Sequence, residues 1–101
     1  MNWFLGGTFD GGKNVGLECI VEYNNETNGW EAYSIIAYNN SDNIYDAYFI
    51  DNTTQEIINS ANSIRILPHT GYDTISNYVK TFVGNTTDNL SPGIIVVKAG
   101  Q

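Results

Sequence analysis

A glycine-rich stretch near the start of the chain is the first place where residue types and spacing could do chemistry. Residues 4–16, FLGGTFDGGKNVG, contain five glycines beside one aspartate and one lysine. Successive backbone N–H groups in such a loop can bind an anion, and Gly11, Gly12 and Lys13 are the candidates for that contact. Asp-Gly and Gly-Gly pairs also supply positive φ at little steric cost, as a tight hairpin turn requires. We therefore predict a β-hairpin turn at residues 10–13, with the anion contact as the alternative.

The same stretch carries a short family resemblance. Gly6 to Asp10, GGTFD, is similar to the start of the nucleotidylyltransferase signature, in which Gly-Gly-Thr-Phe-Asp-Pro precedes His-x-Gly-His. Here Gly11 stands in the place of the proline, and Lys13 to Gly16, KNVG, stands in the place of the histidine pair. Because the resemblance implies a reaction that needs those imidazoles, we do not predict that activity. A P-loop and a dinucleotide fingerprint are not predicted either, since both need a helix directly after the glycines.

The other reactive side chains, His69 and Cys19, are the one histidine and the one cysteine of the chain. His69 precedes Asp73 by four residues, but no nucleophile motif surrounds it, which indicates a solvated or capping residue. Cys19 has no basic neighbour in sequence and lies on the apolar side of an alternating segment, which is typical of a buried thiol. The acidic turns at 39–43 and 51–56 lack EF-hand spacing for Ca²⁺. We predict no catalytic residue, no metal and no cofactor.

Length and charge narrow the kind of partner. The chain has 101 residues, and its 4 basic residues against 11 acidic ones give a net charge of -7 at pH 7. That charge repels phosphates, so we expect no nucleic-acid partner. No stretch approaches the roughly 20 apolar residues of a membrane span, so we expect no membrane partner. The single cysteine and the lack of signal-peptide features favour a cytoplasmic protein. The frequent Asn, Ile and Tyr suggest a microbial or viral source, and a viral protein would act in the cytoplasm of its host.

The spacing of apolar residues predicts one α+β domain over residues 1–101. Alternation predicts strands before and after the glycine-rich turn and again at 30–38 and 44–51. Runs rich in β-branched residues predict later strands at 63–68 and 93–99, the last of them buried on both faces.

Two helices are predicted between these strands. Thr53 and Glu56 have the spacing of a capping box and predict a short helix within residues 52–63. Apolar residues at i, i+3, i+4 and i+7 from Ile75 to Phe82 predict a second helix over residues 73–85. The order β-β-β-β-α-β-α-β indicates an antiparallel sheet of about five to six strands with both helices on one face.

The aromatic residues carry the binding prediction. One small core cannot hide 7 tyrosines and 2 tryptophans, and tyrosine is enriched in interfaces. Strict alternation over residues 30–38 assigns one face to Trp30, Ala32, Ser34, Ile36 and Tyr38, and the other to Glu31, Tyr33, Ile35 and Ala37. We predict a sheet-face binding surface built from Trp30, Tyr33, Tyr38, Tyr45 and Tyr48. Ordinary cross-strand pairing of these aromatics is the alternative.

These features favour a small, acidic binding protein without enzymatic activity that recognises a basic protein through aromatics and carboxylates. An immunity-type inhibitor of a basic toxin and a viral anti-defence protein fit this description. The first alternative is an oligomeric module that binds or sequesters a sugar or nucleotide, with Lys13 near an anionic group. A further alternative is a virion or filament subunit, which would explain apolar residues on both faces of residues 30–38.

Overall fold

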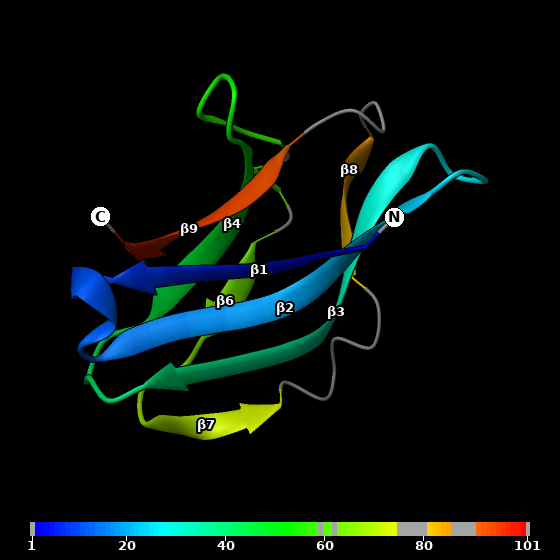
Figure 1. The fold of residues 1–101 in the computed structure, drawn as a ribbon. Helices are drawn as coiled ribbons and strands as arrows, with labels where there is room; N and C mark the ends of the chain where they lie inside the picture. Colours follow the sequence, from blue (N-terminus) through cyan, green and yellow to red (C-terminus); the bar gives the residue numbers. More distant parts are fainter. Residues whose placement is uncertain (1, 59, 62, 75–80, 86–90, 101) are drawn as a thin grey trace.

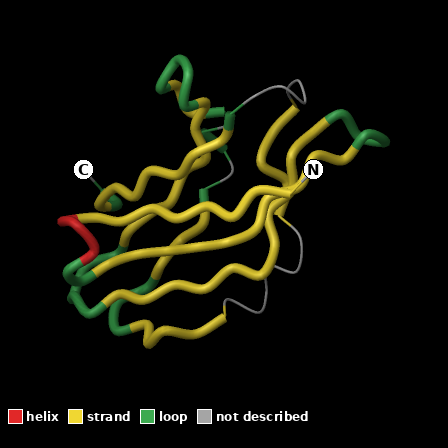
Figure 2. Tube along the Cα trace, viewed as in Figure 1, coloured by secondary structure: helices red, strands yellow, loops and turns green. Residues whose placement is uncertain are grey.

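The described strands form two antiparallel sheets that lie one over the other (Figure 1). The computed structural model describes residues 2–58, 60–61, 63–74, 81–85 and 91–100, and for 2, 72–74 and 81–85 it describes the backbone alone. Figure 2 shows that strands dominate this part of the chain, and its one helical element is the short 3₁₀ turn η1 (Asp10–Gly12). The predicted α+β class, with two helices packed on a sheet, is therefore wrong, and the fold is nearly all β.

The first sheet is built on a three-stranded meander. Strands β1 (Asn2–Phe9), β2 (Val15–Asn24) and β3 (Gly29–Asn39) follow one another through two hairpins. Two short strands, β7 (Thr70–Thr74) and β8 (Thr81–Asn85), pair with different ends of β3. The hairpin turn predicted between the first two strands is confirmed.

The second sheet repeats this plan around β4 (Tyr45–Asp51). Strand β9 (Pro92–Lys98) pairs with it along its full length. The short strands β5 (Glu56–Ile57) and β6 (Ile64–Ile66) pair with its two ends. The strands predicted at 63–68 and 93–99 are thus confirmed, but Val97 is exposed, so β9 is not buried on both faces.

The hydrophobic core lies between the two sheets. Alternate residues of β2 point into it, as the sequence predicts, and their partners come from β3, β4, β6 and β9. Its buried members are Val15, Leu17, Cys19, Val21, Trp30, Ala32, Ile35, Ala37, Tyr45, Ala47, Phe49, Ile64, Ile66 and Val96. Since both sheets contribute, each sheet keeps one inner and one outer face.

The helix predicted within residues 52–63 is a hairpin turn instead. The Asp51 carboxylate accepts the backbone N–H of Thr53 at 2.9 Å, the bond of an Asx turn rather than of a helix cap. Gln55 then adopts a φ of 64°, and the chain returns as β5 beside β4. Because a helix of so few residues is marginal in water, strand pairing outweighs the capping-box pattern of Thr53 and Glu56.

The helix predicted over residues 73–85 is also wrong. Its first residues belong to β7 and its last to β8, while residues 75–80 lie outside the described part of the chain. The segment carries several β-branched residues, which suit a strand. Pairing with β3 also satisfies backbone groups that an open sheet edge would leave unpaired.

A β-bulge in β3 changes which residues face the core. Ser34 and Ile35 lie opposite the single residue Cys19 of β2, and Ser34 is exposed with a φ of 52°. One extra residue on a strand reverses the sides that follow it. Ile35 and Ala37 therefore point inward. The outer side is shared by Glu31, Tyr33, Ile36 and Tyr38, which corrects the faces predicted by strict alternation.

Candidate binding surface

The outer face of the first sheet collects side chains from β1, β2 and β3. Residues paired across antiparallel strands share a face, so the pairs Phe4–Ile20 and Ile20–Tyr33 make one row across the sheet. Phe4 is 73% exposed. We call this surface the first outer face, and it consists of Phe4, Gly6, Thr8, Gly16, Glu18, Ile20, Glu22, Glu31, Tyr33, Ile36 and Tyr38.

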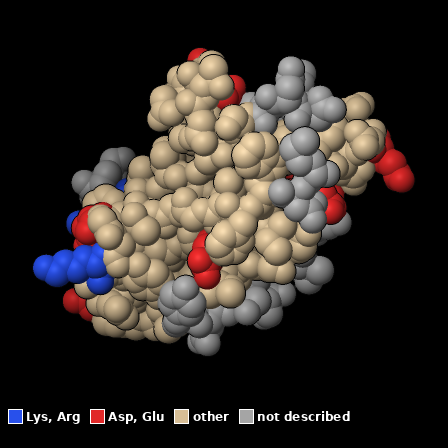
Figure 3. All heavy atoms as spheres, viewed as in Figure 1, with Lys and Arg blue, Asp and Glu red and all other residues tan. Residues whose placement is uncertain are grey.

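Two carboxylates of the first outer face stand directly opposite each other. Glu22 of β2 pairs in register with Glu31 of β3, and Glu31 accepts a hydrogen bond from the Asn24 amide at 3.3 Å. Like charges in this position repel. Figure 3 views the molecule with β1, β2 and β3 in front, and the surface is mostly uncharged, with acidic atoms scattered over it and basic atoms at one end.

A hollow of about 540 Å³ lies in the same region. It is lined by Gly6, Gly7, Thr8, Gly16, Leu17, Glu18, Ile36, Tyr38 and Ile94. Gly6 and Gly16 put no side chain on the outer face, so backbone forms part of the lining. A Cβ atom at Gly6 would meet the Leu17 carbonyl oxygen at 3.7 Å and Glu18 Cβ at 4.0 Å, which are ordinary van der Waals distances, so a methyl group fits at this position without a clash. The volume is in the range of small-ligand sites.

Tyr38 borders the hollow and is held at both ends. Its ring lies on Gly16, since a Cβ atom there would be 2.6 Å from ring carbon Cε1. Its hydroxyl donates a hydrogen bond to the carbonyl oxygen of Gly12 in the β1–β2 turn. The structure thus brings together two predicted site residues, Tyr38 and Gly12, that are far apart in sequence.

In the turn where the anion contact is predicted, the carboxylate of Asp10 is hydrogen-bonded within the turn. Asp10, Gly11 and Gly12 all have positive φ, as the hairpin prediction requires. The Asp10 carboxylate accepts the backbone N–H of Asn14 at 3.2 Å and its side-chain amide at 3.1 Å. Lys13 is exposed at the tip of the hairpin. Anion binding by Gly11, Gly12 and Lys13 stays a prediction.

The five predicted aromatics do not form one surface. Trp30 and Tyr45 are buried in the core, where Trp30 meets the Tyr23 ring edge-on and Tyr45 contacts the Phe9 ring. Tyr33 and Tyr38 lie on the first outer face. Tyr48 points away from both groups, on the opposite side of the molecule, because β4 alternates with Ala47 and Phe49 inward.

The outer face of the second sheet is organised around an ion pair. Asp46 and Arg65 are cross-strand partners joined by two hydrogen bonds, 3.0 Å from Nε to Oδ1 and 3.1 Å from Nη2 to Oδ2. The Asp46 side chain is only 8% exposed and that of Arg65 is 55% exposed. We call this surface the second outer face, and it consists of Asp46, Tyr48, Ile50, Ile57, Arg65, Ile95 and Val97.

The cysteine is not placed for nucleophilic chemistry. Cys19 is 1% exposed among apolar core residues. Burial raises the pKa of its thiol to about 12, because the thiolate would lose its hydration. Cys19 is therefore a protonated thiol at neutral pH.

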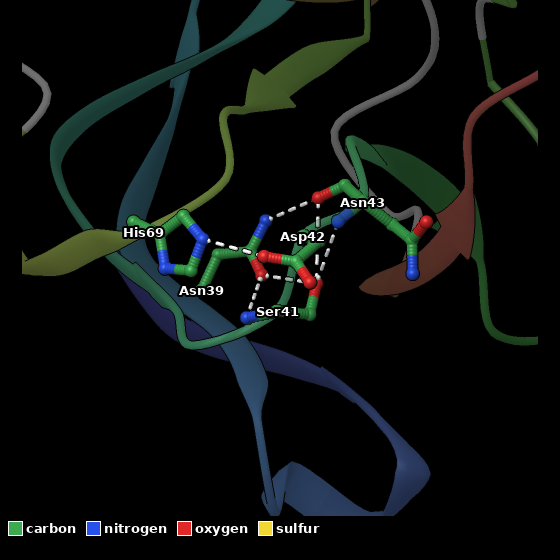
Figure 4. A network of polar contacts seen from close by, with 5 residues as sticks. All are labelled: Asn39, Ser41, Asp42, Asn43 and His69. Atoms are coloured by element: carbon green, nitrogen blue, oxygen red, sulfur yellow. Dashed lines mark hydrogen bonds and ion pairs between the residues drawn. The ribbon is translucent and has the colours of Figure 1, made fainter.

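His69 belongs to a contact between two loops (Figure 4). Its Nε2 lies 2.7 Å from Oδ1 of Asp42, and both side chains are largely exposed. Below them, the buried Asn39 amide donates to the carbonyl oxygens of Asn43 at 2.8 Å and Ile66 at 3.3 Å. The Asn39 Oδ1 accepts a hydrogen bond from the Ser41 hydroxyl at 2.7 Å. Asn39 thus connects the β3–β4 turn to the end of β6. Among the described residues, no three His, Cys, Asp or Glu side chains gather as a metal site would require.

Sequence reasoning missed the residues that shape the hollow. Gly6, Gly16 and Ile36 enter it only through the register of β1, β2 and β3. One signal was present: Gly16 interrupts an otherwise alternating segment on its polar side, and a glycine inside a strand often marks a close approach. Phe4 was also missed, although it lies two residues before the Gly6–Gly7 pair in the sequence.

Comparisons with protein-family models, with curated proteins and with solved structures give no match for this chain. Within the described residues, no helix is long and apolar enough to cross a membrane. The case for function therefore rests on the two outer faces and the hollow.

Proposed function

We propose that this protein is a small, acidic, non-enzymatic binding protein that holds a basic protein partner against the first outer face. An inhibitor or an immunity-type protein acts in this way, by covering a partner's surface. The buried Cys19 thiol and the exposed His69–Asp42 pair give no arrangement of nucleophile and base, which supports binding rather than catalysis.

The observation that carries the proposal is the Glu22–Glu31 pair beside exposed apolar groups. Both carboxylates already have an interaction within the chain, but a carboxylate has about four acceptor sites, so a cationic group from a partner can still bind between these two like charges. Phe4 and Tyr33, one row away, offer apolar contact area to the same partner. A net charge of -7 adds long-range attraction for a basic protein.

Selection from a displayed library of random peptides tests this proposal. The enriched peptides are expected to be basic with apolar residues, and their affinity should fall at least about tenfold between about 0.1 M and about 1 M salt. Glu22→Gln combined with Glu31→Gln should weaken binding to a similar degree. Phe4→Ser should also weaken it.

Tyr48→Ser is the matched control, because it removes an aromatic ring from the second outer face. It should leave peptide affinity within about twofold. Neutral or acidic peptides, or equal losses from Phe4→Ser and Tyr48→Ser, would contradict the proposal.

The hollow favours a second candidate, a module that binds a small ligand such as a sugar. Its volume of about 540 Å³ and its tyrosine wall are typical of such sites. A thermal-shift panel of neutral monosaccharides and nucleotides tests this candidate. A rise in Tm that is lost in Gly6→Val supports it, and an unshifted Tm across the panel rejects it.

A further inference from the structure

The hollow differs from the rest of the first outer face because it combines an aromatic wall with a carboxylate. Tyr38 forms the wall, and its ring is fixed by Gly16 on one side and by the hydroxyl bond to Gly12. A ring held in place loses little freedom when a flat group stacks on it. The hollow is thus preorganised for a planar guest.

Glu18 gives the hollow its charge. It follows Gly16 by two residues on the same face of β2, which places the two positions about 7 Å apart along the strand. Glu18 already has an interaction within the chain. A carboxylate has about four acceptor sites, so such a contact leaves capacity for a further donor.

An arginine side chain fits both features at once. Its guanidinium group is planar and cationic, so it can stack on an aromatic ring while its N–H groups reach a carboxylate. A lysine ammonium group is compact and strongly hydrated, and it cannot stack in this way. Gly6, which puts no side chain beside the Tyr38 ring, leaves room for the aliphatic stem.

We propose that the hollow receives an arginine side chain of the basic partner, with its guanidinium group against Tyr38 and hydrogen-bonded to Glu18. This inference rests on the proposed function and names the anchor by which the partner is recognised. An arginine in a pocket surrounded by apolar contacts is a frequent anchor of protein interfaces.

An NMR titration with N-acetyl-arginine methylamide tests the anchor directly. Saturable shifts are expected for the backbone signals of Gly6, Gly16 and Tyr38. N-acetyl-citrulline methylamide has the same shape without the charge, and its affinity should be at least roughly tenfold lower than that of the arginine probe. Methyl glucoside should produce no saturable shift at these signals.

Gly6→Val is the blocking variant, because it adds a branched side chain to the lining of the hollow at a position where a Cβ atom makes only ordinary van der Waals contacts. It should abolish the arginine shifts, whereas Tyr48→Leu on the second outer face should leave them unchanged. Glu18→Gln should weaken binding of the arginine probe roughly tenfold and serves as the second variant if Gly6→Val does not fold. Equal binding of the arginine and citrulline probes, or retention of arginine binding by folded Gly6→Val, would overturn the anchor.

The selected basic peptides separate this inference from the proposed function. The arginine anchor is wrong, and the proposed basic partner is still supported, if the selected peptides bind Gly6→Val as tightly as the unchanged protein and if replacing their arginines by lysine leaves their affinity unchanged. If the library gives no basic peptides but the arginine probe binds in the hollow, the proposed function is wrong and the anchor site stands as a small-ligand site.

Discussion

The two outer faces of the sandwich each present a cross-strand pair of charged residues, with opposite consequences. On the second outer face Asp46 stands opposite Arg65, and two hydrogen bonds join them. On the first outer face Glu22 stands opposite Glu31. The geometry of a paired strand is the same in both places, so the difference lies in the residue types. One outer face pairs opposite charges across its strands, and the other places two like charges in register.

The surroundings of the two pairs reinforce this contrast. Asp46 is nearly buried, so its charge depends on Arg65. The first outer face instead has a hollow where glycines replace side chains. We infer that the second outer face is organised for stability and the first for contact with a cationic group.

Arg65→Met should give the largest loss of stability, because it breaks the charge balance of the second outer face. Methionine keeps the length of the apolar stem but leaves the Asp46 carboxylate without its bidentate partner. Allowing for the exposure of Arg65, we expect the free energy of unfolding to fall by about 3 kcal/mol. Urea unfolding measures it. A loss no larger than that of Lys13→Met, at the exposed hairpin tip, would show that the pair is not structural.

Gly7→Ala should cost about 2 kcal/mol, because overpacking is expensive where backbone is involved. A Cβ atom at Gly7 would lie 2.6 Å from Cγ2 and 3.0 Å from the carbonyl oxygen of Ile94 in β9. Gly6→Ala, one residue away on the open side of β1, should change stability by less than about 0.5 kcal/mol. Thermal unfolding of the two variants measures the difference. Equal losses would mean that the hollow side of β1 is as tightly packed as its inner side.

The strand pattern could be predicted from the sequence where one side of a strand is consistently apolar. In the segment around Cys19 every second residue is apolar, and the structure buries that side. Segments 52–63 and 73–85 could not be predicted, because their local signals conflict with their strand pairing. Thr53 and Glu56 match a helix cap, yet the Asp51 carboxylate accepts the N–H of Thr53 and closes a hairpin.

The candidate site was only partly predictable for a related reason. Tyr33 and Tyr38 could be named from composition, but strict alternation assigned them to opposite sides of the strand. The bulge at Ser34 brings them to the same side, and the adjacent pair Ile35 and Ile36 was the one local hint of it. The hollow depends on the register of three strands, which no single segment encodes.

Raising the pH should destabilise the native state through Cys19, which lies on the inner side of the first sheet. Burial raises the pKa of this thiol from 9.0 to about 12, so the unfolded chain loses the proton first. Between these values the unfolded state binds fewer protons, and the free energy of unfolding should fall by about 1.4 kcal/mol per pH unit from this group. Urea unfolding from about pH 8 to about pH 11 measures it, with Cys19→Ala as the control for other titrating groups. Parallel pH curves for the two proteins would show that the thiol is accessible in the native state.

Glu31→Gln should have the smallest effect and the opposite sign. It removes one of two facing charges while keeping an acceptor for the Asn24 amide, so the free energy of unfolding should rise by about 0.5 kcal/mol. The gain should disappear in about 1 M salt, because screening removes the repulsion that it relieves. Glu26→Gln, in the exposed β2–β3 turn, is the matched control and should have a smaller effect. If Glu31→Gln destabilises the protein instead, Glu31 is a structural residue like Asp46, and the contrast between the two outer faces fails at its central pair.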